Sequence, residues 1–196
     1  MGININSKIL LSVASIAAAA ALVIGATFAF FSDEETSSDN VFASGTLDLK
    51  LSDDTPETDQ DGVSASFGGT DLAPGDSVSG QLRLKNAGTV NGDHAEIAVV
   101  NTNSDLTNPL DEVLEITTLD YDSSSVLGQL SDNNSNGWID LDDLEALGLD
   151  NLSLTDLNTN HPLDLTVQFR SDAGNDYQGD NVDSDWTITL NQDSSQ

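Results

Sequence analysis

Cysteine is absent from the 196 residues of this chain, and basic residues are scarce. Without cysteine, no disulfide bond can brace the fold, and thiolate chemistry is excluded from catalysis and metal binding. Five Lys and Arg residues stand against 34 Asp and Glu residues, which gives a net charge of −29 at pH 7. Nucleic acid is therefore excluded as a partner, because binding it requires cationic side chains that neutralise phosphates.

The excess of acidic residues favours a saline environment outside the cytoplasm. Every acidic residue follows residue 32, and the acids are distributed along the chain rather than clustered. In dilute buffer their mutual repulsion would destabilise a small domain, whereas at about 1 M salt the Debye length falls to about 3 Å and the repulsion is screened. The composition thus predicts a halophilic protein of the cell surface or the medium.

An uncharged apolar run from Ile9 to Phe31 dominates the start of the chain, with the single cation Lys8 ahead of it. This arrangement predicts an export signal peptide at residues 1–29, and the small residues near its end favour cleavage after Ala29. The run is also long enough to cross a bilayer core of about 30 Å, so retention as a membrane anchor is the alternative. Either outcome places the rest of the chain outside the cytoplasm, with residues 30–40 as a mobile N-terminal arm.

Alternating apolar and polar residues recur through the remainder of the chain, with the period of half-buried β-strands. Clusters of Gly, Pro, Asn and Asp separate the alternating segments, as expected of an antiparallel sandwich. The predicted strands occupy residues 46–51, 78–84, 95–99, 113–117, 163–169 and 186–190. We therefore predict an all-β sandwich domain over residues 41–196.

One insertion interrupts the β pattern. Residues 132–143 match the twelve-residue calcium loop of EF-hand proteins, in which a glycine, here Gly137, permits the sharp turn at position six. Ile139 would anchor this loop to the core. The predicted ligands are Asp132, Asn134, Asn136, the main-chain carbonyl of Trp138, Asp140 and Asp143. Apolar residues with helical spacing follow and end at Gly148, so we predict a loop–helix insertion over residues 132–148.

This loop resembles a dockerin-type calcium loop more than a calmodulin-type one, because Asp143 stands where a bidentate Glu is usual and no second loop follows. Its two Asn ligands lower the ligand charge, which predicts affinity in the range of about 10⁻⁴–10⁻³ M found in extracellular modules. We interpret the Ca²⁺ as structural. The alternative is an Asp- and Asn-rich loop that matches by chance. Asn133 and Asn151 also lie in glycosylation sequons.

Several segments carry, in order along the chain, a resemblance to a known family. They are the N-terminal signal, FASGTLDL at residues 42–49, LAPGD at 72–76, GQLRLKNAG at 80–88, NDYQG at 175–179 and WTITLNQ at 186–192. Together they resemble the TasA/camelysin family of secreted proteins, which a SipW-type signal peptidase processes. The resemblance implies a jelly-roll β-sandwich and a role as a structural subunit of extracellular filaments or biofilm matrix.

The resemblance also implies a homo-polymer, in contact with the membrane only through the signal segment. We predict that, after cleavage, the segment from Phe30 through Leu51 adds a strand to the next subunit. Its apolar anchors, which would fill pockets on the acceptor, are Phe30, Phe31, Val41 and Phe42. Head-to-tail contacts that do not close produce filaments. The alternative is a membrane-anchored monomeric calcium-binding module that serves in adhesion.

Catalysis finds little support in the sequence. Camelysin is described as a metalloprotease, and such enzymes usually hold a metal with a His-Glu-x-x-His motif. This chain lacks that motif, and its two histidines, His94 and His161, are far apart and each precede a predicted strand. We interpret both as surface or turn residues and predict that the chain is not an enzyme.

Overall fold

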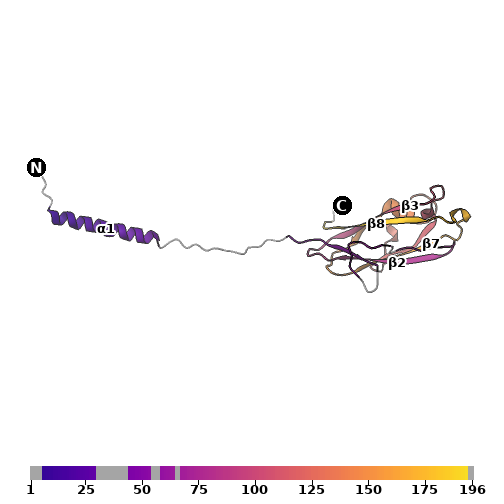
Figure 1. Cartoon of the computed structure of the whole chain (residues 1–196), viewed down its shortest axis with the longest axis horizontal. Coiled ribbons are helices and arrows are strands. Elements are labelled where there is room, and N and C mark those ends of the chain that lie inside the picture. The colour runs from indigo at the N-terminus through magenta and orange to yellow at the C-terminus, as the bar shows by residue number, and fades with distance from the viewer. Residues whose placement is uncertain (1–5, 30–43, 54–57, 65–66, 194–196) are drawn as a thin grey trace. The chain divides into compact units, whose positions relative to one another are not determined.

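The computed structural model describes residues 6–29, 44–53, 58–64 and 67–193. The chain divides into two compact units, residues 1–43 and residues 44–196. The first unit contains helix α1, Ser7–Ala29 (Figure 1). Among the described residues, no helix is long and apolar enough to cross a membrane. The anchors assigned to the polymerisation arm, Phe30, Phe31, Val41 and Phe42, lie outside the described residues.

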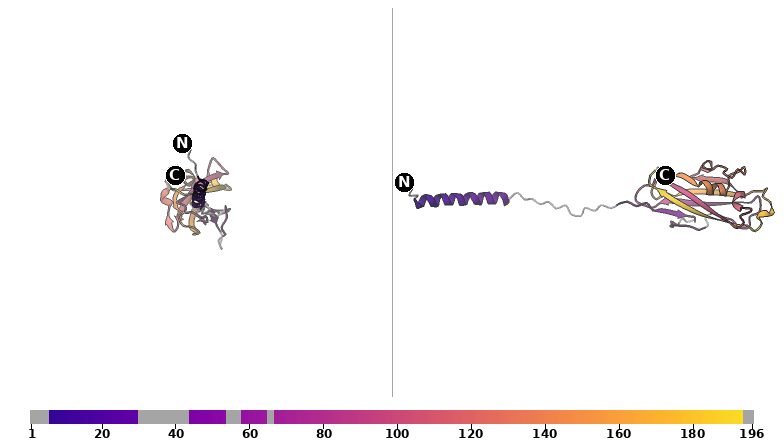
Figure 2. Two further views of the ribbon diagram at one scale, coloured as in Figure 1. Left: turned by 90° about the vertical axis from the view of Figure 1, so that its left-hand side faces the viewer. Right: turned by 90° about the horizontal axis from the view of Figure 1, so that it is seen from above.

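The second unit is built from two antiparallel sheets, which Figure 1 shows as separate layers with β2 and β7 on one side and β3 and β8 on the other. The larger sheet has the order β1 (Leu49–Ser52), β2 (Ser77–Asn86), β7 (His161–Phe169), β4 (Leu114–Tyr121) and β5 (Ser124–Ser125). The smaller sheet has the order β6 (Leu149–Ser153), β3 (His94–Asn103) and β8 (Val182–Asn191). Figure 2 shows the same sheets from two other directions.

Short helical segments connect these strands. The 3₁₀ turn η1, Leu110–Val113, leads into β4, and a second turn η2, Leu127–Gln129, follows β5. Helix α2, Leu141–Leu147, lies between β4 and β6 in the sequence and packs against η1, β3 and β4. A third turn, η3, Asn175–Tyr177, precedes β8. Helix α2 and Gly148 thus occupy the place predicted for the helix that follows the loop.

The core lies between the sheets and follows from the alternation in the strands. In β7 every second residue is buried, from His161 to Phe169. Leu163 faces its β2 partner Leu82, and the core face of β3 adds Ile97 from the other sheet. Burying each such aliphatic side chain contributes about 1.5–3 kcal/mol, which makes this interior the main source of stability in a chain without disulfides.

The all-β class is confirmed, whereas the jelly-roll topology remains a prediction. The six predicted strands correspond to β1, β2, β3, β4, β7 and β8. Strand β1 begins at Leu49 rather than at Thr46, although the Thr46 carbonyl still accepts a hydrogen bond from the amide of Thr89 at 2.8 Å. The sequence reasoning missed β5, because it has only two residues, and β6, because its burial does not alternate.

Strand β8 forms one edge of the smaller sheet. It pairs with β3 over ten residue pairs, from Asn191 opposite His94 to Val182 opposite Asn103. In the part of the chain that the structure describes, no second strand pairs with β8. Among these described strands, β8 is therefore paired on one side only over its ten residues.

Candidate metal centre

The loop over residues 132–139 turns alternate residues inward. Asp132, Asn134, Asn136 and Trp138 are partly buried, whereas the residues between them are exposed. The backbone at Gly137 has a φ of 102°, a conformation that residues with a Cβ rarely adopt. The glycine therefore permits the turn that places the predicted ligand side chains on one side of the loop.

In the first half of the loop, side-chain oxygens bind main-chain amides. The Asp132 carboxylate accepts hydrogen bonds from the amide of Asn136 at 3.0 Å and from that of Gly137 at 2.8 Å. The side-chain oxygen of Asn134 accepts from the Asn136 amide at 3.1 Å. These bonds fix the turn, and they leave Asp132 and Asn134 oriented towards the loop interior.

In the second half, two carboxylates begin helix α2. Asp140 and Asp143 form a reciprocal capping box, in which each side chain accepts a hydrogen bond from the amide of the other at 3.1 and 3.2 Å. Asp143 also accepts from the amide of Asn133 at 2.6 Å, which joins the two ends of the loop. Both carboxylates are fully buried.

Burial raises the pKa of Asp140 to about 6, and the nearby Asp143 charge adds to this increase, while hydrogen bonds from Asn136 and from the Asp143 amide oppose it. The carboxylate oxygens of Asp140, Asp142 and Asp143 lie within 4.8 Å of one another. Uncompensated negative charge in this buried position favours either a proton or a bound cation. The oxygen donors present here suit a hard cation such as Ca²⁺.

The structure thus brings together Asp140 and Asp143 of the predicted ligand set. It adds Asp142, which sequence reasoning did not select, and it places the side-chain amide of Asn136 2.6 Å from Asp140. Asn136 would have to turn its oxygen inward to bind a cation. Asp132 accepts hydrogen bonds from main-chain amides and is not one of the three clustered carboxylates, so the complete ligand set remains a prediction.

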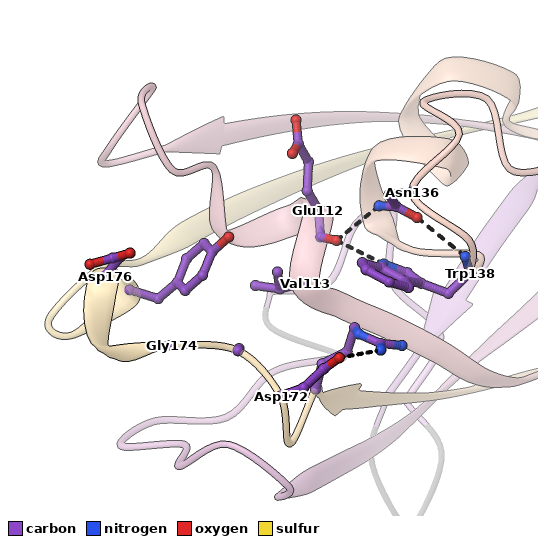
Figure 3. A pocket seen from close by; sticks show the side chains of 10 residues that line it. Glu112, Val113, Asn136, Trp138, Asp172, Gly174 and Asp176 are labelled. Atoms are coloured by element: carbon purple, nitrogen blue, oxygen red, sulfur yellow. Dashed lines mark hydrogen bonds and ion pairs between the residues drawn. The ribbon is translucent and has the colours of Figure 1, made fainter.

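The loop is docked on η1 and β4, as Figure 3 shows at η1. The main-chain oxygen of Glu112 accepts hydrogen bonds from Asn136 Nδ2 at 3.2 Å and from Trp138 Nε1 at 2.9 Å. The guanidinium of Arg170 lies 3.5 Å from the centre of the Trp138 ring, a cation–π contact. The amide of Ile116 in β4 donates to the carbonyl of Ile139 at 2.8 Å. The loop is therefore held by η1, by β4 and by Arg170.

A second cluster lies where β3, β6 and β8 meet. His94 is 4% exposed, so the interpretation of this residue as a surface or turn histidine was wrong. Its Nδ1 lies 3.0 Å from Asp93 Oδ2, and its Nε2 lies 3.2 Å from Glu96 Oε1 and 3.7 Å from Asp150 Oδ1. The hydrogen bond to Asp93 and the other carboxylates raise the pKa of His94, against the opposing effect of burial.

His161 is also buried rather than exposed, since it begins the inward-facing series of β7. Its Nδ1 lies 2.6 Å from Asp122 Oδ2, and its ring stacks on Tyr121 with 6.0 Å between the ring centres. It is separate from the cluster around His94, and it contributes to packing at the end of β4.

Comparison with known proteins assigns the chain to a family. The family described as camelysin metallo-endopeptidase matches residues 4–196, which is nearly the whole chain. The chain belongs to the camelysin family. A search of curated proteins found no match.

Membership of the camelysin family confirms the predicted resemblance, and it agrees with a protein that is extracellular or associated with the cell surface. The family's description names a metallo-endopeptidase, so it does not support the prediction that the chain is not an enzyme. The name also makes a metal plausible without specifying Ca²⁺. The described part of this camelysin-family chain contains donor sets of two kinds, the all-oxygen loop and the histidine cluster.

A third group in this camelysin-family chain also escaped the sequence reasoning. Asp111 in η1 lies near Asp142 and Glu145 of α2, with carboxylate oxygens within 4.8 Å of one another. Asp111 is 3% exposed, and its buried Oδ1 has no hydrogen-bond partner. Desolvation is the largest cause that raises the pKa of Glu112, and the Asp142 and Asp111 charges add to it. Only the packing of η1 on α2 reveals this group, because the residues are separated in the sequence.

Proposed function

We propose that this chain is a secreted structural subunit of extracellular filaments or matrix, stabilised by Ca²⁺ in the loop at residues 132–143. A SipW-type signal peptidase would remove residues 1–29, and the exposed N-terminal segment would then join one copy to the next. Camelysin-family membership supports the extracellular role. The observation that carries the assembly step is the ten-residue edge strand β8, which pairs on one side only among the described residues.

Strand β8 suits an acceptor of a donated strand. An edge strand presents unpaired amide and carbonyl groups, and ten residues at about 3.4 Å each provide about 34 Å of pairing surface. Asp183 and Asp185 are exposed along it. Their charges disfavour pairing of two β8 strands from different copies, while a donor of low charge would still be accepted.

Pairing within the same chain limits which residues could act as the donated strand. Residues Leu49–Ser52 already pair with β2 of the same chain, from Leu49 opposite Asn86 to Ser52 opposite Arg83. The carbonyls of Thr46 and Asp48 also accept hydrogen bonds from the same chain. The donated strand would therefore come from residues that precede Thr46, which include the apolar pair Val41 and Phe42. In the donor role, main-chain hydrogen bonds would supply affinity and these side chains would set the register.

Calcium would act on the fold rather than on the junction. The loop contacts η1 through Glu112 and β4 through Ile116 and Ile139. A cation between the Asp140 and Asp143 carboxylates would relieve their repulsion and hold the start of α2 on the sheet. Removing Ca²⁺ would loosen this side of the sandwich. Filaments would then fray, because their subunits would no longer be rigid.

The proposal is tested by electron microscopy of the purified secreted protein in molar salt, first with Ca²⁺ and then with excess chelator. Filaments with Ca²⁺ that fray on chelation support it. The double variant Val41→Ser, Phe42→Ser should remain monomeric, whereas the control Ser37→Ala, Ser38→Ala should form filaments like the parent. Monodisperse particles of the parent in both conditions would contradict the proposal. A mass that retains residues 1–29 would then favour the alternative, a membrane-anchored module that serves in adhesion.

A further inference from the structure

His94, Glu96 and Asp150 converge from two paired strands of the smaller sheet. His94 and Glu96 are two residues apart in β3, so their side chains share one face. Asp150 comes from β6, which pairs with β3 across an irregularity in register between Ala95 and Ile97. One potential ligand atom from each of the three residues lies within 4.8 Å of the other two.

The spacing of these atoms matches a small transition-metal ion. Ligands bound at about 2.0–2.2 Å in tetrahedral geometry are separated from one another by about 3.3–3.6 Å. In the structure, His94 Nε2 lies 3.2 Å from Glu96 Oε1 and 3.7 Å from Asp150 Oδ1. These two distances lie close to the tetrahedral separation, and the ligand atoms of Glu96 and Asp150 lie within 4.8 Å of each other, so side-chain adjustment would place all three around one ion.

The imidazole is also oriented as a metal ligand requires. Asp93 Oδ2 lies 3.0 Å from His94 Nδ1, and metal-binding histidines generally donate their second ring N–H to such a carboxylate. With the proton on Nδ1, the lone pair of Nε2 faces Glu96 and Asp150. The side-chain amide of Asn191 lies 3.4 Å from Nε2 on the neighbouring strand β8. Burial of the His94 ring keeps it in this position.

One side of the cluster is open to solvent. Glu96 and Asp150 line a surface pocket together with Gly148, Thr187 and Thr189. The His94 side chain is 4% exposed, whereas those of Glu96 and Asp150 are 33% and 55% exposed. A metal held here would keep a coordination position for water or another small ligand, which distinguishes open sites from closed structural zinc sites.

We propose that His94, Glu96 and Asp150 form a binding site for a divalent transition metal of the zinc class, oriented by Asp93 and open to the pocket beside Gly148. The nitrogen donor selects against Ca²⁺, which prefers oxygen ligands, so this site differs in chemistry from the loop at residues 132–143. It shares no residue with that loop. It is also independent of filament formation, so the failure of either proposal would leave the other intact.

The competing explanation is a protonated imidazole held by three carboxylates without any metal. In that state both ring nitrogens carry a proton, whereas a metal-bound His94 carries one only on Nδ1. The chain suits this distinction because it has two histidines and no cysteine. Nitrogen-15 spectra of the imidazoles therefore contain signals from His94 and His161 alone.

The experiment titrates the chelator-treated secreted protein with Co²⁺ and then Zn²⁺, following the visible Co²⁺ absorption and the imidazole spectra. We expect one Co²⁺ ion per chain, displaced by Zn²⁺ but not by excess Ca²⁺, and a shift of one histidine only. His94→Gln should weaken Co²⁺ binding at least about 100-fold, and Asp93→Asn about 10–100-fold. The matched control His161→Gln should bind Co²⁺ like the parent, since His161 contacts Asp122 and lies outside the cluster.

Binding of equal strength in the parent and in His94→Gln would overturn the proposal. So would two protons on the His94 ring that persist in excess Zn²⁺. If His94→Gln does not fold, as judged by circular dichroism, Glu96→Gln and Asp150→Asn replace it, because both side chains are more exposed. Unchanged Co²⁺ affinity in both of these variants would equally refute the site.

Discussion

Replacing Asp140 with Asn removes the negative charge at the centre of the loop at residues 132–143, and it converts one of two hydrogen-bond acceptors into a donor. Asp140 is fully buried, and its pKa is raised from 3.8 to about 6. The folded state therefore binds the proton more tightly than the unfolded state does, so the free energy of unfolding decreases as the pH rises from about 4 to about 6. This difference in pKa lowers the free energy of unfolding at neutral pH by about 3 kcal/mol.

The amide that Asp140→Asn introduces cannot ionise, and Asn remains a good N-cap residue for α2. In chelator at pH 7.5, we expect Asp140→Asn to be more stable than the parent by up to about 3 kcal/mol, or roughly 6–12 °C in melting temperature for a domain of this size. With Ca²⁺ the order should reverse, because the parent keeps a charged ligand that the variant lacks.

The assay is thermal unfolding followed by circular dichroism in molar salt, at pH 5 and pH 7.5, with chelator and with Ca²⁺. The surface carboxylates change the pH dependence of both proteins alike, so the difference between the two proteins reports on Asp140. Equal pH dependence of the two proteins in chelator would show that Asp140 carries no uncompensated charge.

Three further outcomes follow from burial and hydrogen bonding. Asp111→Asn should raise the free energy of unfolding in chelator by about 1–3 kcal/mol, because it removes a buried negative charge beside Asp142 and Glu145, to which the new amide can donate. Urea unfolding measures this change, and a loss of stability would contradict it. Leu144→Ala should cost about 2–5 kcal/mol, since Leu144 is fully buried in α2, and an exposed substitution, Leu147→Ala, serves as its control in the same assay. Trp138→Phe removes the hydrogen bond to the Glu112 carbonyl and should lower the free energy of unfolding by about 1–2 kcal/mol. It should also weaken Ca²⁺ binding, measured by calorimetry, and unchanged affinity would mean that η1 does not support the loop.

The strands were predictable because their alternation is local. In β7 the buried residues recur at every second position over nine residues, so the sequence alone indicates both the strand and its core face. Strand β6 escaped because only its residues Leu149 and Leu152 are buried, and Asn151 between them has a φ of 54°. A backbone in that conformation breaks the two-residue period on which the prediction rests.

The turn at Gly137 and the helix that follows it were predictable because their pattern is contiguous, whereas Ca²⁺ binding by this loop stays a prediction. Gly137, the alternate oxygen-bearing residues and the following helix all lie within residues 132–148. The cluster around His94 was not recognisable, because it depends on the register between β3 and β6. Asp150 meets His94 only through that pairing and its irregularity, which no local pattern records. Such a site becomes visible only when the strands are placed side by side.

The shortness of α2 has a consequence for how the chain tolerates insertion and deletion. The helix has seven residues, and it joins the loop at Asp143 to Gly148 and then to Asp150. Gly148 has a φ of 66°, and a Cβ there would lie 2.6 Å from the carbonyl oxygen of Ile97, so the exit from the helix is fixed against β3. Removing one residue from α2 would turn everything beyond it by about 100° around the helix axis. The placement of the oxygen-rich loop relative to the histidine cluster therefore depends on the length of α2. An insertion or a deletion in this helix would displace one group relative to the other.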